Sequence, residues 1–103
     1  MTNSPKPVDL NNHHRDTLMK IFQHPTSHNI EWRTVVSLLE AVGSVEEHHD
    51  GKIRVLLGET TLFLEKPRHK DIDVQQVLDL RHLFEGAGYK AVVEELEDRG
   101  VED

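Results

Sequence analysis

The sequence predicts an α+β domain in which a three-stranded antiparallel meander packs against helices. Two observations lead to this prediction. The spacing of apolar residues changes from a helical period to strict alternation and back again, and two tight-turn signals lie inside the alternating part. The chain has 103 residues and no cysteine. That length suits one domain, and the lack of cysteine excludes disulfides, thiolate metal sites and cysteine nucleophiles.

Two helices are expected before the meander. The first covers residues 12–23 and ends at His24, because a residue that precedes proline avoids the α region. The second carries apolar side chains at helical spacing, namely Trp32, Val35, Val36, Leu39 and Val42. We expect Asn29 to cap its N-terminus and Gly43 to end it.

Three strands follow in the alternating part. Residues 44–49 read as a polar edge strand, and Asp50-Gly51 predicts a two-residue type I′ turn, whose central residues both need positive φ. A second strand is indicated by the alternation of Ile53, Val55 and Leu57. Gly58-Glu59 suits a type II′ turn, and residues 60–65 complete the meander with Leu62 and Leu64 on one face.

A third helix has a well-marked start after the meander. Asp73 is the expected N-cap, and Gln76 three residues later completes a capping box. Gly86 and Gly88 are expected to close this helix. A final amphipathic stripe consists of Tyr89, Val92, Val93 and Leu96. Such a stripe usually covers core, so we expect it to pack on the body of the domain.

The expected organisation is a disordered lead-in (residues 1–10), a single α+β domain (11–89) and an acidic helical tail (90–103). The formal net charge is −7, and the tail holds six acidic against two basic residues. A folded body with such a tail can still present a basic face to a partner. The sequence shows neither an apolar leader nor a run of about 20 apolar residues, so we expect a cytoplasmic protein without membrane contact.

Most catalytic and metal-binding signatures are missing. The adjacent pairs His13-His14 and His48-His49 lack the i, i+4 spacing that puts two imidazoles on one helical face. No serine stands in a nucleophile-elbow pattern, and no glycine-rich phosphate loop is present. We therefore expect no metal and no cofactor.

One basic cluster lies between the last strand and the capped helix. It consists of Lys66, Pro67, Arg68, His69 and Lys70. Cations beside a helix N-terminus favour anion binding, because backbone N–H groups converge there. Lys52 and Arg54 of the second strand are expected to extend this surface toward the phosphates of RNA or DNA. The alternative is a solvated loop whose charges are countered by Asp71 and Asp73.

The order of short motifs over residues 32–89 is distinctive. A helix ending in Leu-Leu-Glu-Ala-Val-Gly (38–43) leads into the meander; Pro-Arg-His-Lys-Asp-Ile (67–72) precedes a helix with Val77, Leu80 and Arg81; and Ala-Gly-Tyr (87–89) follows. This order resembles the HicA family, the small toxins of type II toxin–antitoxin systems. The resemblance implies a double-stranded-RNA-binding-like α-β-β-β-α core, here with an additional N-terminal helix and a C-terminal helical tail.

The resemblance also bears on activity, because many family members cleave RNA. Their catalytic histidine follows a Gly-Ser pair at the start of the second strand, where this chain has Gly51-Lys52-Ile53-Arg54. We therefore expect a HicA-like module that binds nucleic acid or a protein without cleaving RNA, through Lys52, Arg54, Arg68, His69 and Lys70. The alternative is an active mRNA interferase that uses His49 or His69.

The expected partners are RNA, or an antitoxin-like or other protein. A protein-interaction domain would use the stripe of residues 89–96 or an exposed strand edge as its contact. Residues 46–49 are charged or histidine, which blunts that edge against pairing with another strand.

Overall fold

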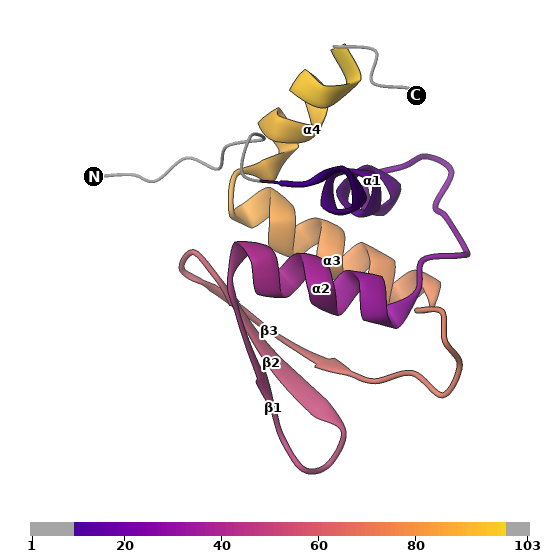
Figure 1. Ribbon diagram of the computed structural model, residues 1–103, viewed down its shortest axis with the longest axis vertical. Helices are drawn as coiled ribbons and strands as arrows, with labels where there is room; N and C mark the ends of the chain where they lie inside the picture. The colour runs from indigo at the N-terminus through magenta and orange to yellow at the C-terminus, as the bar shows by residue number, and fades with distance from the viewer. Residues whose placement is uncertain (1–9, 99–103) are drawn as a thin grey trace.

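The computed structural model describes residues 10–98 and confirms the α+β class. Its elements in chain order are α1 (Asn12–Ile21), α2 (Trp32–Val42), β1 (Ser44–Glu47), β2 (Lys52–Leu57), β3 (Thr60–Glu65), α3 (Val74–Gly86) and α4 (Tyr89–Asp98). In Figure 1, α2 and α3 both lie between the sheet and α1; α2 contacts β1 and β2, whereas α3 contacts β3. Within the described residues, no helix is long and apolar enough to cross a bilayer.

The sheet is the predicted meander, with strand order β1-β2-β3 and antiparallel pairing throughout. The second turn has the predicted two-residue loop, and Gly58 adopts the positive φ, 61°, that its first position requires. The first turn differs from the prediction. The His48 N–H donates to the Lys52 carbonyl (2.8 Å), so the loop contains three residues and ends at Gly51, with φ 84°. A left-handed glycine at the end of a three-residue loop is a common hairpin solution.

The core lies between the sheet and the helices. On the sheet, the covered face presents Ile53, Val55, Leu57 and Leu64, all buried. The helices supply the largest fully buried side chains, which include Leu18, Ile21, Leu38, Leu39, Leu80, Phe84 and Leu96. The strand residues between those of the covered face point the other way, as strand geometry requires. Lys52, Arg54 and Leu56 on β2 therefore share an open face with Thr61, Phe63 and Glu65 on β3.

The start of α2 does not follow the prediction. Asn29 does not cap the helix, and its side chain instead accepts a hydrogen bond from the Ser27 hydroxyl (2.8 Å). The N-cap is Glu31, which makes no side-chain cap bond. Its backbone is extended, with φ −79° and ψ 142°, because Glu31 forms an isolated antiparallel bridge with Asp71. Tertiary pairing therefore sets this helix boundary, and the local capping signal does not.

The start of α3 agrees with the prediction. The Asp73 carboxylate accepts from the Gln76 N–H (2.8 Å), and the Gln76 side chain accepts from the Asp73 N–H (3.2 Å). Near the other end of α3, Arg81 donates to the carbonyls of Ile21 (3.0 Å) and Gln23 (3.1 Å). This guanidinium therefore satisfies carbonyl groups at the C-terminal end of α1, which ties the first helix to the third.

The final helix packs on the body, as expected. Tyr89, Val92, Val93 and Leu96 are all buried. The Tyr89 ring meets the Phe84 ring edge-on, with 5.2 Å between centroids and an interplanar angle of 82°. The predicted boundary between body and tail, after residue 89, falls at the first turn of α4. Leu10 is buried, whereas the rest of the expected lead-in (1–9) and the last tail residues (99–103) lie outside the described residues.

Candidate nucleic-acid interface

The basic connection, residues 66–71, joins β3 to α3 and is held at both ends by backbone hydrogen bonds. At its start, the Lys66 N–H donates to the Gly51 carbonyl in the β1–β2 turn (3.1 Å). At its end, the Trp32 N–H donates to the Lys70 carbonyl (2.7 Å). The next bond in this direction joins the Ile72 N–H to the Ile30 carbonyl (2.9 Å). The connection is therefore anchored to two segments that are distant in sequence.

Between these anchors the chain presents side chains to solvent. Arg68 and His69 are exposed and line a groove of about 620 Å³. The groove runs from Phe63 of β3 along the connection to the first turns of α3, where Gln75 and Gln76 line it. Carboxylates also line it, namely Glu65, Asp71, Asp73 and Asp79. The cations thus sit on a surface that also carries negative charge.

Glu31 links the basic connection to the start of α2. Its carboxylate lies 3.8 Å from Lys70 Nζ and 3.5 Å from Arg33 Nε. The side chains of Lys70 and Arg33 are 78% and 89% exposed, so water screens both ion pairs. These pairs orient the two cations but leave both accessible to a further anion.

A second hollow, of about 230 Å³, lies where the β1–β2 turn meets the connection. Its polar lining includes His48, His49, Lys52 and Lys66, and Trp32 of α2 also lines it. Two segments far apart in the sequence therefore supply cations and imidazoles to one small surface, which the Glu47 carboxylate also lines. Lys52 and the basic cluster that contains Lys66 were predicted from the sequence as parts of one surface, whereas Trp32 was predicted only as an apolar residue of the second helix.

The residues proposed from sequence as contacts for nucleic acid do not form one continuous surface. Arg68, His69 and Lys70 lie together in the connection, and Lys52 is near Lys66 in the hollow. Arg54 instead projects from the open face of the sheet, where its guanidinium donates to Glu46 (3.1 Å). The two candidate catalytic histidines do not share a pocket, because His49 lines the hollow whereas His69 lines the groove.

The N-terminus of α3 is already occupied by its own cap. The Asp73 carboxylate takes the position that a bound anion would have at this helix start. The Gln76 amide is further engaged, because its Nε2 donates to the Glu65 carbonyl (2.7 Å). Anion binding here would therefore depend on the side-chain cations of the connection and not on the helix terminus.

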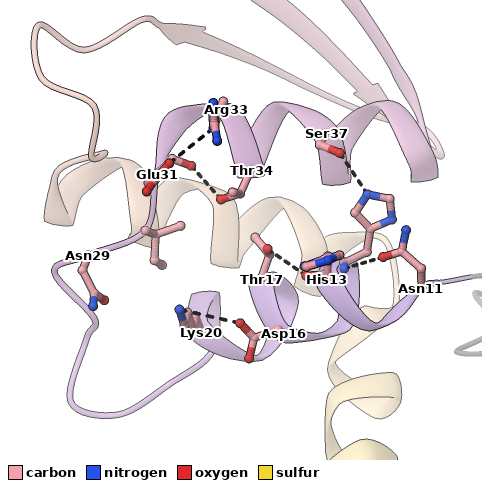
Figure 2. A pocket seen from close by; sticks show the side chains of 12 residues that line it. Asn11, His13, Asp16, Thr17, Lys20, Asn29, Glu31, Arg33, Thr34 and Ser37 are labelled. Atoms are coloured by element: carbon pink, nitrogen blue, oxygen red, sulfur yellow. Dashed lines mark hydrogen bonds and ion pairs between the residues drawn. The ribbon is translucent and has the colours of Figure 1, made fainter.

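A further polar groove, which the sequence did not indicate, lies between α1 and α2 (Figure 2). It has a volume of about 450 Å³. His14 Nε2 and Ser37 Oγ share a hydrogen bond of 3.0 Å across it, and Lys20 lies 3.6 Å from Asp16 on its rim. The hydrogen bond joins α1 to α2, whereas the ion pair lies within α1. Spacing along the chain could not reveal the bond between His14 and Ser37, because these residues lie on different helices, whereas Asp16 and Lys20 have the i, i+4 spacing of a helical ion pair.

Comparisons with protein-family models, with curated proteins and with solved structures found no match to this chain. The resemblance to the HicA family therefore stays a prediction. Among residues 10–98, no group of three or more His, Asp or Glu side chains is arranged to hold a metal ion.

Proposed function

We propose that this domain is a HicA-like nucleic-acid-binding module, which binds RNA through its basic connection without cleaving it. The observation that carries the proposal is the anchoring of residues 66–71 at both ends by backbone hydrogen bonds. An anchored loop loses little conformational entropy when it binds, so its cations contribute more of their interaction energy to affinity. Lys66, Arg68 and Lys70 would contact phosphates.

The charge balance indicates a modest affinity. Four lysine or arginine side chains lie in or beside the connection, namely Lys52, Lys66, Arg68 and Lys70. Each phosphate contact releases condensed counterions, so affinity falls steeply with salt. The carboxylates of Glu31, Asp71 and Asp73 oppose part of this gain. We therefore expect dissociation constants of about 1–100 μM at low salt, as in sequence-independent binding.

The test is fluorescence anisotropy with a labelled RNA hairpin that carries a single-stranded overhang, titrated at several salt concentrations. Arg68→Glu should weaken binding about tenfold and reduce the salt slope by about one contact. The matched control is Lys90→Glu, which changes net charge equally but lies past the other end of α3. We expect this control to weaken binding by less than about twofold, because it removes only long-range attraction.

Two results would refute the proposal. One is a wild-type protein that fails to bind either RNA or DNA at the lowest salt. The other is an equal loss of affinity for Arg68→Glu and Lys90→Glu, because the net charge of the protein, and not a local contact at Arg68, would then explain the binding.

A second candidate function is RNA cleavage of the mRNA-interferase type, and one observation favours it. His48 and His49 line the same hollow as Lys52 and Lys66. An imidazole can act as general acid or base, and an adjacent ammonium can stabilise a phosphate whose charge increases during reaction. Cleavage of an end-labelled RNA by wild type, lost in His49→Ala but kept in His69→Ala, would support this role. RNA that stays intact with wild-type protein would exclude it.

A further inference from the structure

The open face of the sheet exposes two large apolar side chains. Leu56 on β2 is 38% exposed and Phe63 on β3 is 59% exposed. Both helices that cover the sheet lie on its other face (Figure 1). A phenylalanine with most of its surface in water loses the free energy that burial would provide, which is why such patches often mark interfaces.

The charges around this patch are balanced. Glu46 and Glu65 are acidic, whereas Lys52 and Arg54 are basic. The nearby His48 lies 3.9 Å from Glu46, and the face has no net charge when this imidazole is neutral. Arg54 is already paired with Glu46 at 3.1 Å. A nucleic acid, or a strongly charged protein surface, would meet as many like charges as opposite ones. A face with both signs around an apolar centre is instead suited to a copy of itself.

We infer that a second copy of this chain covers the open face in a two-fold dimer whose axis runs between β2 and β3, parallel to both strands. Sheets that pack face to face keep their strands within about 30° of each other, about 10 Å apart. Rotation about this axis places β2 of one copy over β3 of the other. Residues that are cross-strand neighbours within one copy then face each other between copies.

The observed register makes each of these facing pairs favourable. Lys52 is the register partner of Glu65, so these opposite charges face each other across the dimer. Arg54 is the partner of Phe63, so the aliphatic part of the Arg54 side chain faces an aromatic ring while its guanidinium stays paired with Glu46. Leu56 is the partner of Thr61, so an aliphatic side chain meets a β-branched one. The two-fold axis makes each contact twice.

The size of the face limits the affinity. The two strands that overlap, β2 and β3, have six residues each and span roughly 200 Å² at spacings of about 4.8 Å between strands and 3.4 Å per residue. Stable interfaces bury about 800 Å² per partner. The dimer should therefore be weak, with a dissociation constant of about 10–500 μM. Phe63 and Glu65 of this face also line the groove that contains Arg68, but the dimer contacts use neither Arg68 nor Lys70. The inference therefore stands whether or not the protein binds RNA.

The first test is sedimentation equilibrium of the full chain from about 10 μM to 1 mM, a range that brackets the expected dissociation constant. The weight-average mass should rise from the 11.9 kDa of one chain toward twice that value. Phe63→Ala should weaken the association at least about tenfold, because the ring is then absent from both copies. Glu59→Lys, in the β2–β3 turn, is a matched surface control that should leave the association unchanged.

A pair of charge variants tests the axis itself. Lys52→Glu and Glu65→Lys should each be more weakly associated than wild type, because each homodimer then sets like charges against each other twice. An equimolar mixture should associate again, since both facing pairs become opposite in charge. Repulsion within each chain persists in the mixture, so only contact between copies explains the recovery. A wild-type protein that is monomeric at the highest concentration, or a mixture that shows no recovery, would overturn the inference.

Discussion

The two faces of the meander are built from the same three strands but have opposite environments. Along β2, Ile53, Val55 and Leu57 are buried under α2 and α3, whereas Arg54 and Leu56 between them face outward. Leu56 and Leu57 are adjacent and chemically identical, yet one is 38% exposed and the other 3%. The strand period alone separates them.

The two faces should therefore differ in how much their residues contribute to the free energy of folding. Residues of the covered face contribute free energy of folding, because their apolar area leaves water when the helices pack. Residues of the open face contribute little to folding because their apolar area stays in water, which leaves it available to the second copy inferred above. Substitutions on the two faces should therefore be separable by experiment, with stability changing on one face and association on the other.

The largest effect should come from the adjacent leucines. Leu57→Ala leaves a cavity under the helices and should lower the free energy of unfolding by about 2–5 kcal/mol. Leu56→Ala, the same change one residue earlier, should cost less than about 0.5 kcal/mol because the site is exposed. Urea denaturation at a dilute, monomeric concentration measures both values. Equal costs would mean that the two faces are not distinct.

A close approach between α2 and the sheet should give the next largest effect. A Cβ at Gly43 would collide with the Leu56 carbonyl oxygen on β2. Gly43→Ala should therefore cost about 1–3 kcal/mol through overpacking. Gly51→Ala serves as comparison, because its Cβ would meet open space and its cost of about 1–2 kcal/mol would come from the positive φ of 84°. Thermal melts of the two variants, together with a structure of Gly43→Ala, would distinguish displacement of β2 from backbone strain.

The start of α3 should give an intermediate effect. Asp73→Ala removes the carboxylate that accepts from the Gln76 N–H, and it should cost about 1 kcal/mol. Glu85→Ala, an exposed acidic residue at the other end of the same helix, should change stability by less than about 0.5 kcal/mol. Chemical denaturation compares the two. If both variants lost a similarly small amount of free energy of unfolding, the capping box would contribute little to the stability of α3.

The smallest effect should come from the ion pair on the open face. The side chains of Arg54 and Glu46 are 42% and 61% exposed, so solvent screens their attraction. A double-mutant cycle with alanine at both positions should give a coupling free energy of about 0.2–1 kcal/mol, and less at high salt. A coupling above this range would indicate that the open face contributes to folding and would weaken the contrast with the covered face.

Much of the fold could be predicted because local signals encode it. The bounds of β3 and the capping box at Asp73 and Gln76 agree with the structure, since both depend on residues only a few positions apart. The predicted length of the β1–β2 loop was wrong by one residue, because Asp50-Gly51 indicates a hairpin without fixing how many residues its loop contains. Contacts between distant segments were missed altogether. Arg81 reaches α1, and Glu31 pairs with Asp71, through packing that no local pattern encodes.

The candidate site shows the same division. Composition alone located the basic cluster of residues 66–70, but nothing local indicated that the β1–β2 turn would anchor it. The outward position of Arg54 could be predicted from the alternation along its strand. The same alternation could have revealed Phe63, which lies between the inward-facing Leu62 and Leu64. The signal was present, because an aromatic residue at an outward strand position is unusual in a solvated face.

The anchored connection also has a consequence for the order of folding. Trp32 and Lys70 pair across the whole meander, so this contact closes a loop of roughly 40 residues, which is entropically unfavourable in an unfolded chain. The two hairpins inside that loop close only short segments and shorten the effective distance between its ends once they form. We therefore expect the basic surface to assemble late in folding, after the strands have paired. Residues that speed hairpin formation would then govern how soon a newly made chain acquires the anchored connection, even though they lie outside it.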